Sequence, residues 1–120
     1  MKRTPINHPD LFGFDDVHLP RLTGAISAAA LRVLNRLMQG PLTREQVDAI
    51  AGWSNGPELM RSLKNRGLVW VCERVQTVNR DGRVTRRGLY HITDVGRAQV
   101  RRWMFERAQA AAAAALAEEV

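Results

Sequence analysis

Residues 43–67 read TREQVDAIAGWSNGPELMRSLKNRG, and they carry the clearest helix signals in the chain. Thr43 is followed three residues later by Gln46, which is the pattern of a capping box, so we expect a short helix to begin there and to end at Gly52. Pro57 suits the start of another helix, because the N–H that proline lacks has no partner in the first turn of any helix. The stretch therefore predicts two short helices joined by a tight turn.

The second of these helices is predicted to be amphipathic. Leu59, Met60 and Leu63 fall on one face at helical spacing, and the opposite face is polar. The residues that we expect on this outward face are Asn55, Glu58, Arg61, Ser62 and Asn65. For two of them a structural role is the alternative to a ligand contact. Asn55 suits the N-cap of the helix, and Glu58 in the first turn is favoured by the helix dipole.

Upstream, apolar residues recur at intervals of three and four and predict another helix that follows Thr23. We expect Thr23 to cap this helix and the Gly40-Pro41 pair to stop it. Arg32 and Arg36 fall on its outer face. The apolar stripe consists of Ile26, Ala29, Ala30, Val33, Leu34, Leu37 and Met38.

Downstream of the third helix, which ends at Gly67, the apolar pattern changes to an alternation with a period of two. Two strands are predicted, over residues 69–78 and 84–92, and the segment Asn79-Arg80-Asp81-Gly82 between them is a strong turn signal. The two strands therefore form a β-hairpin. The cations at its tip and on its return strand are Arg80, Arg83, Arg86 and Arg87.

A final helix is predicted to begin at Asp94 with Thr93 as its cap. Its apolar stripe consists of Val100, Trp103, Met104 and the aliphatic stem of Arg107. The helix continues into an alanine-rich tail over residues 108–120, because alanine has the highest helix propensity. Two interpretations of this tail stay open: a frayed helix, or a homodimer contact in which it packs with Trp103 and Phe105.

Positive charge is concentrated in the segment that holds the third helix and the hairpin. The chain has a formal net charge of +6, but residues 61–107 contain twelve basic and four acidic residues, while the rest of the chain is net negative. All but one of these twelve cations are arginine, whose planar fork suits bidentate contacts to phosphate or guanine. This segregation favours a polyanionic partner.

The length and composition place the chain in one cytoplasmic domain. At 120 residues it can bury a single core, and we divide it into an arm (1–22), a folded domain (23–107) and the alanine-rich tail (108–120). In the arm, Phe12, Phe14 and Val17 are expected to attach it to the body. Cys72 is the only cysteine and no export signal is evident, which fits a reducing compartment. No apolar run is long enough for a membrane span.

The sequence predicts no enzyme, no cofactor and no metal. It has no Ser, His and Asp set and no glycine-rich phosphate loop, and His8, His18 and His91 lack the spacing of metal ligands. Trp53 and Trp70 could stack on nucleic acid, but the large apolar area of tryptophan favours packing in the core.

The predicted order of helix, helix, tight turn, helix and hairpin gives a mainly α fold with a β-hairpin (α+β), namely a winged helix-turn-helix with a long C-terminal helix. In this fold the third helix presents polar side chains to base edges in the major groove, and the hairpin (the wing) reaches the backbone or an adjacent groove. Sequence-specific binding of double-stranded DNA is therefore the predicted function. We expect the DNA contacts to come from Asn55, Glu58, Arg61, Ser62, Asn65, Arg80, Arg83, Arg86 and Arg87.

Two stretches add a family resemblance. Residues 90–97, YHITDVGR, resemble the wing-exit sequence Tyr-x-Leu-Thr-x-x-Gly of winged-helix transcription regulators of the MarR and PadR type, with Ile92 in place of leucine. Residues 40–45, 54–58 and 63–68 resemble small phage and prophage helix-turn-helix proteins. The chain departs from the MarR pattern in lacking a long N-terminal dimerisation helix and an obvious ligand pocket.

The resemblance covers roughly residues 23–102 and implies a phage- or prophage-like transcription regulator that binds DNA through the third helix and the wing. Similar motifs also serve winged helices that bind only protein. The alternative function is therefore a protein-interaction winged helix that docks on a host or phage protein, and a third is RNA binding.

Overall fold

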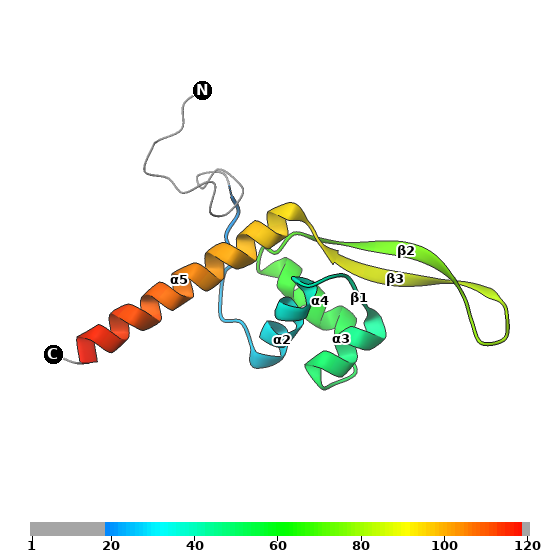
Figure 1. The fold of residues 1–120 in the computed structure, drawn as a ribbon, viewed down its shortest axis with the longest axis horizontal. Coiled ribbons are helices and arrows are strands. Elements are labelled where there is room, and N and C mark those ends of the chain that lie inside the picture. The colour runs from blue at the N-terminus through cyan, green and yellow to red at the C-terminus, as the bar shows by residue number, and fades with distance from the viewer. Residues whose placement is uncertain (1–18, 119–120) are drawn as a thin grey trace, which may run out of the picture.

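The computed structural model describes residues 19–118, and within them the fold combines four helices with one antiparallel sheet (Figure 1). The α+β class expected from the sequence is thus confirmed. The elements in chain order are α2 (Ala28–Leu37), β1 (Leu42–Thr43), α3 (Arg44–Ala51), α4 (Gly56–Asn65), β2 (Trp70–Val78), β3 (Val84–Ile92) and α5 (Asp94–Glu118).

The sheet has three strands in the order β1-β3-β2. The hairpin of β2 and β3 was expected, but β1 was not. Two residues form β1, with Leu42 opposite Tyr90 and Thr43 opposite Leu89. A strand of this length shows no periodicity in a sequence, so only the tertiary pairing reveals it.

The predicted turn of the hairpin is confirmed. Gly82 donates to the carbonyl of Asn79 at 3.0 Å and has a φ of 80°, the left-handed conformation that glycine tolerates best. The Asn79 side chain accepts hydrogen bonds from the backbone N–H groups of Asp81 and Arg83, both at 2.9 Å. These bonds give the tip a defined geometry, so Arg80 and Arg83 leave the backbone at fixed positions.

The core lies between α2, α3, α4, the base of the sheet and the first turns of α5. The apolar stripes that the sequence predicted for the helix after Thr23 and for the helix that holds Leu59, Met60 and Leu63 are buried or packed against this core. Its fully buried side chains include Val33, Leu34, Leu37, Val47, Met60, Leu63, Leu68 and Val100.

Of the three threonine caps expected from the sequence, two are confirmed. Thr43 and Gln46 form the expected reciprocal capping box, and Thr93 accepts a hydrogen bond from the N–H of Gly96 at 3.0 Å. The expectation for Thr23 is wrong, because α2 begins later and Ser27 caps it by accepting from Ala30 at 3.1 Å.

The physical reason is the backbone after Thr23. Gly24 has a φ of 77°, which a helix cannot continue through. Thr23 instead bonds the end of α4, because its backbone N–H and its hydroxyl both donate to the carbonyl of Arg66.

A buried glutamine on α5 connects several segments, and no local pattern in the sequence predicts it. Gln99 is only 1% exposed; its amide oxygen accepts from the N–H of Val69 at 2.9 Å, and its amide nitrogen donates to the carbonyls of Pro20 at 3.0 Å and Gly67 at 2.7 Å. One side chain therefore fixes the start of α5 against the segment between α4 and β2.

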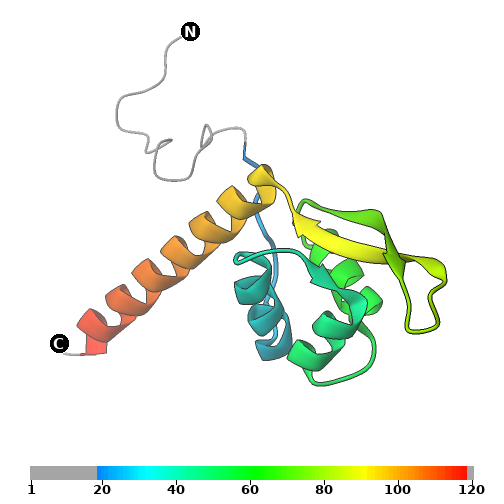
Figure 2. The same cartoon turned by 45° about the vertical axis from the view of Figure 1, so that its right-hand side comes forward.

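Helix α5 extends well beyond the core. Figures 1 and 2 show its C-terminal half leaving the body on the side opposite the hairpin. The helical nature of the alanine-rich tail is confirmed up to Glu118. Over residues 19–118 no helix combines the length and the apolar character needed to cross a membrane. Phe12, Phe14 and Val17 of the arm lie outside the described residues.

Candidate nucleic-acid interface

The outward face of α4 is available to a partner. Asn55, Glu58, Arg61 and Asn65 are exposed, and Ser62 is half-buried. The Arg61 side chain is 70% exposed, and its guanidinium lies 3.6 Å from the Glu58 carboxylate. Because both groups are exposed, water screens this pair and Arg61 stays free to reach a ligand.

The turn between α3 and α4 holds this face in place. The Asp48 carboxylate accepts a hydrogen bond from the N–H of Gly56 at 2.6 Å. A Cβ atom on Gly56 would lie 2.6 Å from that carboxylate oxygen and 3.1 Å from Val47, so the close approach requires glycine. Asn55 occupies the N-cap position, but its side chain makes no capping hydrogen bond. Its amide is therefore not used by α4.

An arginine of α2 binds the C-terminal end of α3, where this turn begins. Arg32 donates to the carbonyls of Ile50 at 2.9 Å and Ala51 at 2.8 Å, which are among the carbonyls left without helical partners at the end of α3. The sequence placed Arg32 on an outer face and gave it no role. Its contact is a tertiary one, between residues eighteen and nineteen positions apart.

The two tryptophans for which packing was expected differ in how far they are buried. Trp70 packs as expected: its indole N–H donates to the carbonyl of Met60 at 2.9 Å, its ring meets Tyr90 edge-on at 5.3 Å, and the Lys64 ammonium lies 4.2 Å from the ring centroid. The packing expectation for Trp53 is wrong, because its side chain is 47% exposed. Gly52 ends α3 with a φ of 87°, so Trp53 follows a chain reversal and lies outside the apolar stripe of that helix.

The register of the hairpin decides which arginines share a face with α4. Arg86 lies opposite Gln76 and Arg74 opposite Gly88, at positions of the same parity as Trp70. Side chains of equal parity project from one face of a sheet. Since Trp70 on this face contacts α4, Arg74 and Arg86 project from the face that carries α4.

Arg87 belongs to the opposite face and has a partner. Its guanidinium lies 2.9 Å from the Glu45 carboxylate in the first turn of α3. A hydrogen bond with its own backbone amide and, second, the hydrogen bond from Arg87 lower the pKa of Glu45. On the same face His91 and Glu73 lie 2.7 Å apart. Arg87 therefore connects the hairpin to α3 as well as adding charge.

Four arginines of the hairpin have no such pairing. Within residues 19–118, the guanidinium groups of these four make no hydrogen bond or ion pair. They are Arg74, Arg80, Arg83 and Arg86. Arg74 was not among the predicted contacts. The alternation of side chains along β2 places it on the same face as Trp70, so the sequence could have indicated Arg74 once the strand was aligned with β3.

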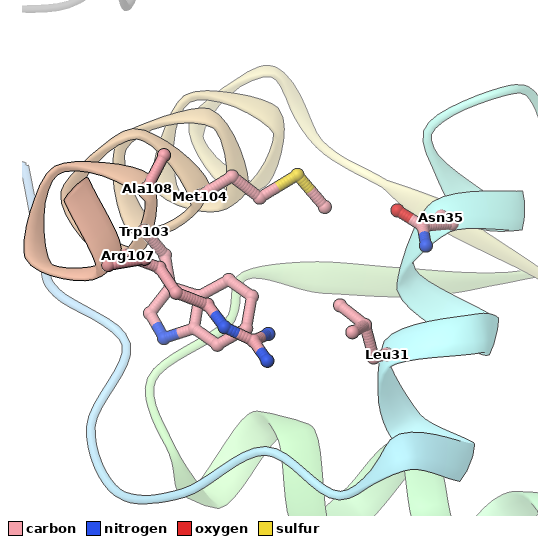
Figure 3. Close-up of a pocket in the computed structure, with 7 residues that line it drawn as sticks. Leu31, Asn35, Trp103, Met104, Arg107 and Ala108 are labelled. Atoms are coloured by element: carbon pink, nitrogen blue, oxygen red, sulfur yellow. The ribbon is translucent and has the colours of Figure 1, made fainter. Parts of the chain in front are cut away.

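Other kinds of site are not evident in the described part of the chain. It contains no group of three or more His, Cys, Asp or Glu residues that could hold a metal ion, and Cys72 is a free, exposed thiol. A groove of about 360 Å³ lies between α2 and α5, where Figure 3 shows Leu31 and Asn35 facing Met104 and Trp103. The Arg107 guanidinium lies over the Trp103 ring, 5.0 Å from its centroid.

The nine predicted contact residues thus occupy two separate elements. Five are on or next to α4 and four are on the hairpin, and the structure exposes all of them except Ser62, which is half-buried.

Comparison of the chain with models of known protein families, with curated proteins and with solved structures found no match.

Proposed function

We propose that this protein is a winged helix-turn-helix that binds double-stranded DNA with sequence preference. The element order α2, β1, α3, α4, β2, β3, α5 supports this assignment, with α3 and α4 as the helix-turn-helix and the β2–β3 hairpin as the wing. The observation that carries the proposal is that unpaired arginines project from the sheet face on which α4 packs.

In this proposal α4 enters the major groove and reads base edges. Arg61 is long enough to bond the O6 and N7 atoms of a guanine, and Asn65 can bond the N6 and N7 atoms of an adenine. Glu58 can accept from cytosine, and each such contact contributes about 1–3 kcal/mol of discrimination. Asp48 and Arg32 position this helix by fixing both ends of the turn.

The wing supplies affinity rather than specificity. Arg80 and Arg83 at the tip, with Arg74 and Arg86 along the strands, can reach phosphates or a narrow minor groove. Contacts to phosphate release counterions and depend steeply on salt. Arg87 projects from the opposite face and pairs with Glu45, so in this proposal it adds positive charge to the hairpin rather than a contact on the α4 side.

As a cellular role we propose a cytoplasmic, phage- or prophage-like transcription regulator that carries out no catalysis. Selection of bound fragments from random duplex DNA tests the sequence preference. We expect one enriched motif for the wild-type chain and a relaxed motif for Arg61→Ala and Asn65→Ala. Arg36→Ala, an exposed arginine on α2, is the matched control and should leave the motif unchanged. Absence of any enriched motif would contradict sequence-specific binding.

The alternative is a winged helix that docks on a host or phage protein. The exposed indole of Trp53 favours it, because an apolar side chain at the turn suits a protein interface. The salt dependence of binding affinity distinguishes the two functions. Affinity for DNA should fall steeply as salt rises, whereas an apolar protein contact should persist.

A further inference from the structure

Two valines face each other at the outer end of the hairpin, where both are open to solvent. Val78 ends β2 and lies opposite Val84, which begins β3. Their side chains are 68% and 65% exposed. Residues directly opposite each other on antiparallel strands have Cβ atoms about 5 Å apart, so the two side chains form one apolar patch. We call this patch the valine pair.

The outer end of the hairpin is apolar on one face only. At the neighbouring position Thr77 lies opposite Thr85, with their hydroxyl oxygens 3.0 Å apart. Successive pairs project from opposite faces of the ribbon, so the threonines and the valines lie back to back. Threonine and valine both favour strands because both are β-branched. The strand conformation alone therefore does not require apolar side chains at 78 and 84.

We propose that the valine pair contacts the deoxyribose rings along the edge of the minor groove when the hairpin binds duplex DNA. This inference rests on the proposed function and adds an apolar contact to the charged contacts of the wing. It assigns the two valines a part in affinity that charge cannot supply.

The charges around the valine pair favour DNA as its partner. Arg86 follows Val84 by two residues on the same face, and Arg80 and Arg83 lie in the turn. Over residues 19–118 the guanidinium groups of these three arginines make no hydrogen bond or ion pair. An apolar protein surface laid over the valines would bury these charges without partners, at a high cost. Duplex DNA instead offers phosphates beside the C–H groups of its sugars.

The width of the minor groove decides which part of the wing enters it. The groove is about 6 Å wide, whereas two strands lie about 4.8 Å apart and carry side chains besides. Only side chains of the turn can therefore enter, and a narrow minor groove attracts arginine. The valine pair is the first strand pair behind the turn. With Arg80 and Arg83 in the groove, it meets the rim that the sugars form.

The hairpin presents the valine pair in a fixed position. The N–H of Asn79 donates to the carbonyl of Arg83 at 2.8 Å, which closes the turn directly behind the two valines. A β-branched side chain has few accessible rotamers, so valine loses little conformational entropy when it is held against a ligand. Both features reduce the cost of ordering this patch on DNA.

Threonine substitutions test the contact while they preserve the hairpin. Val78→Thr and Val84→Thr keep the size and β-branching of valine, and the Thr77–Thr85 pair shows that this ribbon accommodates paired threonines. Binding to a duplex of random sequence is measured by fluorescence anisotropy at several salt concentrations. We expect each single variant to bind about threefold more weakly and the double variant about tenfold, from the lost apolar contact. The slope of log Kobs against log salt should stay that of wild type, because no phosphate contact is lost.

Val71→Thr is the matched control. Val71 is 50% exposed on the same strand, but it lies opposite His91 on the other face of the sheet. The same chemical change at this position should leave the affinity for DNA unchanged. Circular dichroism of all variants checks that they are folded.

Three results would overturn the valine contact although the wild-type chain binds DNA. The first is a double variant with the affinity of wild type. The second is a smaller salt slope in the double variant, which would mean that phosphate contacts were lost instead. The third is equal weakening by Val71→Thr. Absence of DNA binding by the wild-type chain is a different outcome, because it would contradict the proposed function itself.

Replacement of every guanine in the duplex by inosine tests the placement at the minor groove. Inosine lacks the amino group that guanine presents in the minor groove, and it keeps the O6 and N7 atoms of the major groove. Without that group the tip arginines can enter more deeply, so we expect the wild-type chain to bind the inosine duplex at least about threefold more tightly. Equal affinity for the two duplexes would overturn the minor-groove placement.

Discussion

Replacement of Gln99 by leucine tests how the fold holds the proposed interface together. Gln99 bonds three backbone groups, the N–H of Val69 and the carbonyls of Pro20 and Gly67. Gly67 follows α4 and Val69 precedes β2, so this side chain fixes the segment that connects α4 to the hairpin. Gln99→Leu keeps nearly the same volume and removes all three bonds.

The expected loss follows from the number of bonds. A typical hydrogen bond contributes about 1 kcal/mol net, and a buried group left without a partner costs about 1–3 kcal/mol. With little cavity formed, we expect Gln99→Leu to lower the free energy of unfolding by roughly 3 kcal/mol. That is a large fraction of the ~5–15 kcal/mol typical of a domain.

Urea unfolding followed by circular dichroism measures this change. With a slope of about 1.5 kcal/mol/M, the midpoint should fall by about 2 M. Gln39→Leu makes the same chemical change at an exposed residue and should stay within about 0.5 kcal/mol of wild type. A Gln99→Leu chain as stable as wild type would refute the role assigned to this glutamine.

Two further substitutions test contacts around the site. Gly56→Ala should destabilise the fold by about 1–3 kcal/mol in the same urea assay, because the new Cβ meets the Asp48 carboxylate, and an unchanged midpoint would contradict the close approach. Glu45→Gln removes the pair with Arg87 and should cost less than about 1 kcal/mol near pH 7. Because the folded pKa of Glu45 lies below its ordinary value, this contribution is present above the ordinary pKa and is lost as pH falls through the folded pKa, so wild type and variant should converge once the pH lies below the folded pKa. A difference that persists in acid would exclude the ion pair as its source.

Local signals predicted most of the fold. The capping box of Thr43 and Gln46, the turn at Gly82 and the cap at Thr93 each depend on neighbours within a few residues, so the sequence predicts them directly. The start of α2 was misplaced because Thr23 and Ser27 are both good caps, and the conformation of Gly24 decides between them.

Long-range contacts were not predictable from the same signals. Gln99 bonds residues 30 to 79 positions away, and Arg87 meets Glu45 across 42 positions. Strand β1 pairs with β3 across nearly fifty residues. Periodicity and capping report only local structure, so these contacts, and the exposure of Trp53, required the tertiary arrangement.

Which hairpin arginines project from the face that carries α4 was predicted only in part. The sequence placed Arg80, Arg83, Arg86 and Arg87 on the hairpin as equals. The register separates them, because Arg86 shares a face with Trp70 and α4 whereas Arg87 lies on the other face with an acidic partner. Whether a residue holds an odd or even position in a strand tells which face of the sheet it projects from only after the partner strand has been aligned.

The salt dependence of binding to a random DNA duplex tests whether the hairpin arginines contact phosphate. The measurement compares the slope of log Kobs against log salt for the wild-type chain and for the triple variant Arg80→Ala, Arg83→Ala and Arg86→Ala. Each lost phosphate contact should reduce the slope by about 0.9, so we expect a decrease of up to about 2.7 and weaker binding to all sequences. A triple variant with the affinity and slope of wild type would contradict DNA binding by this wing.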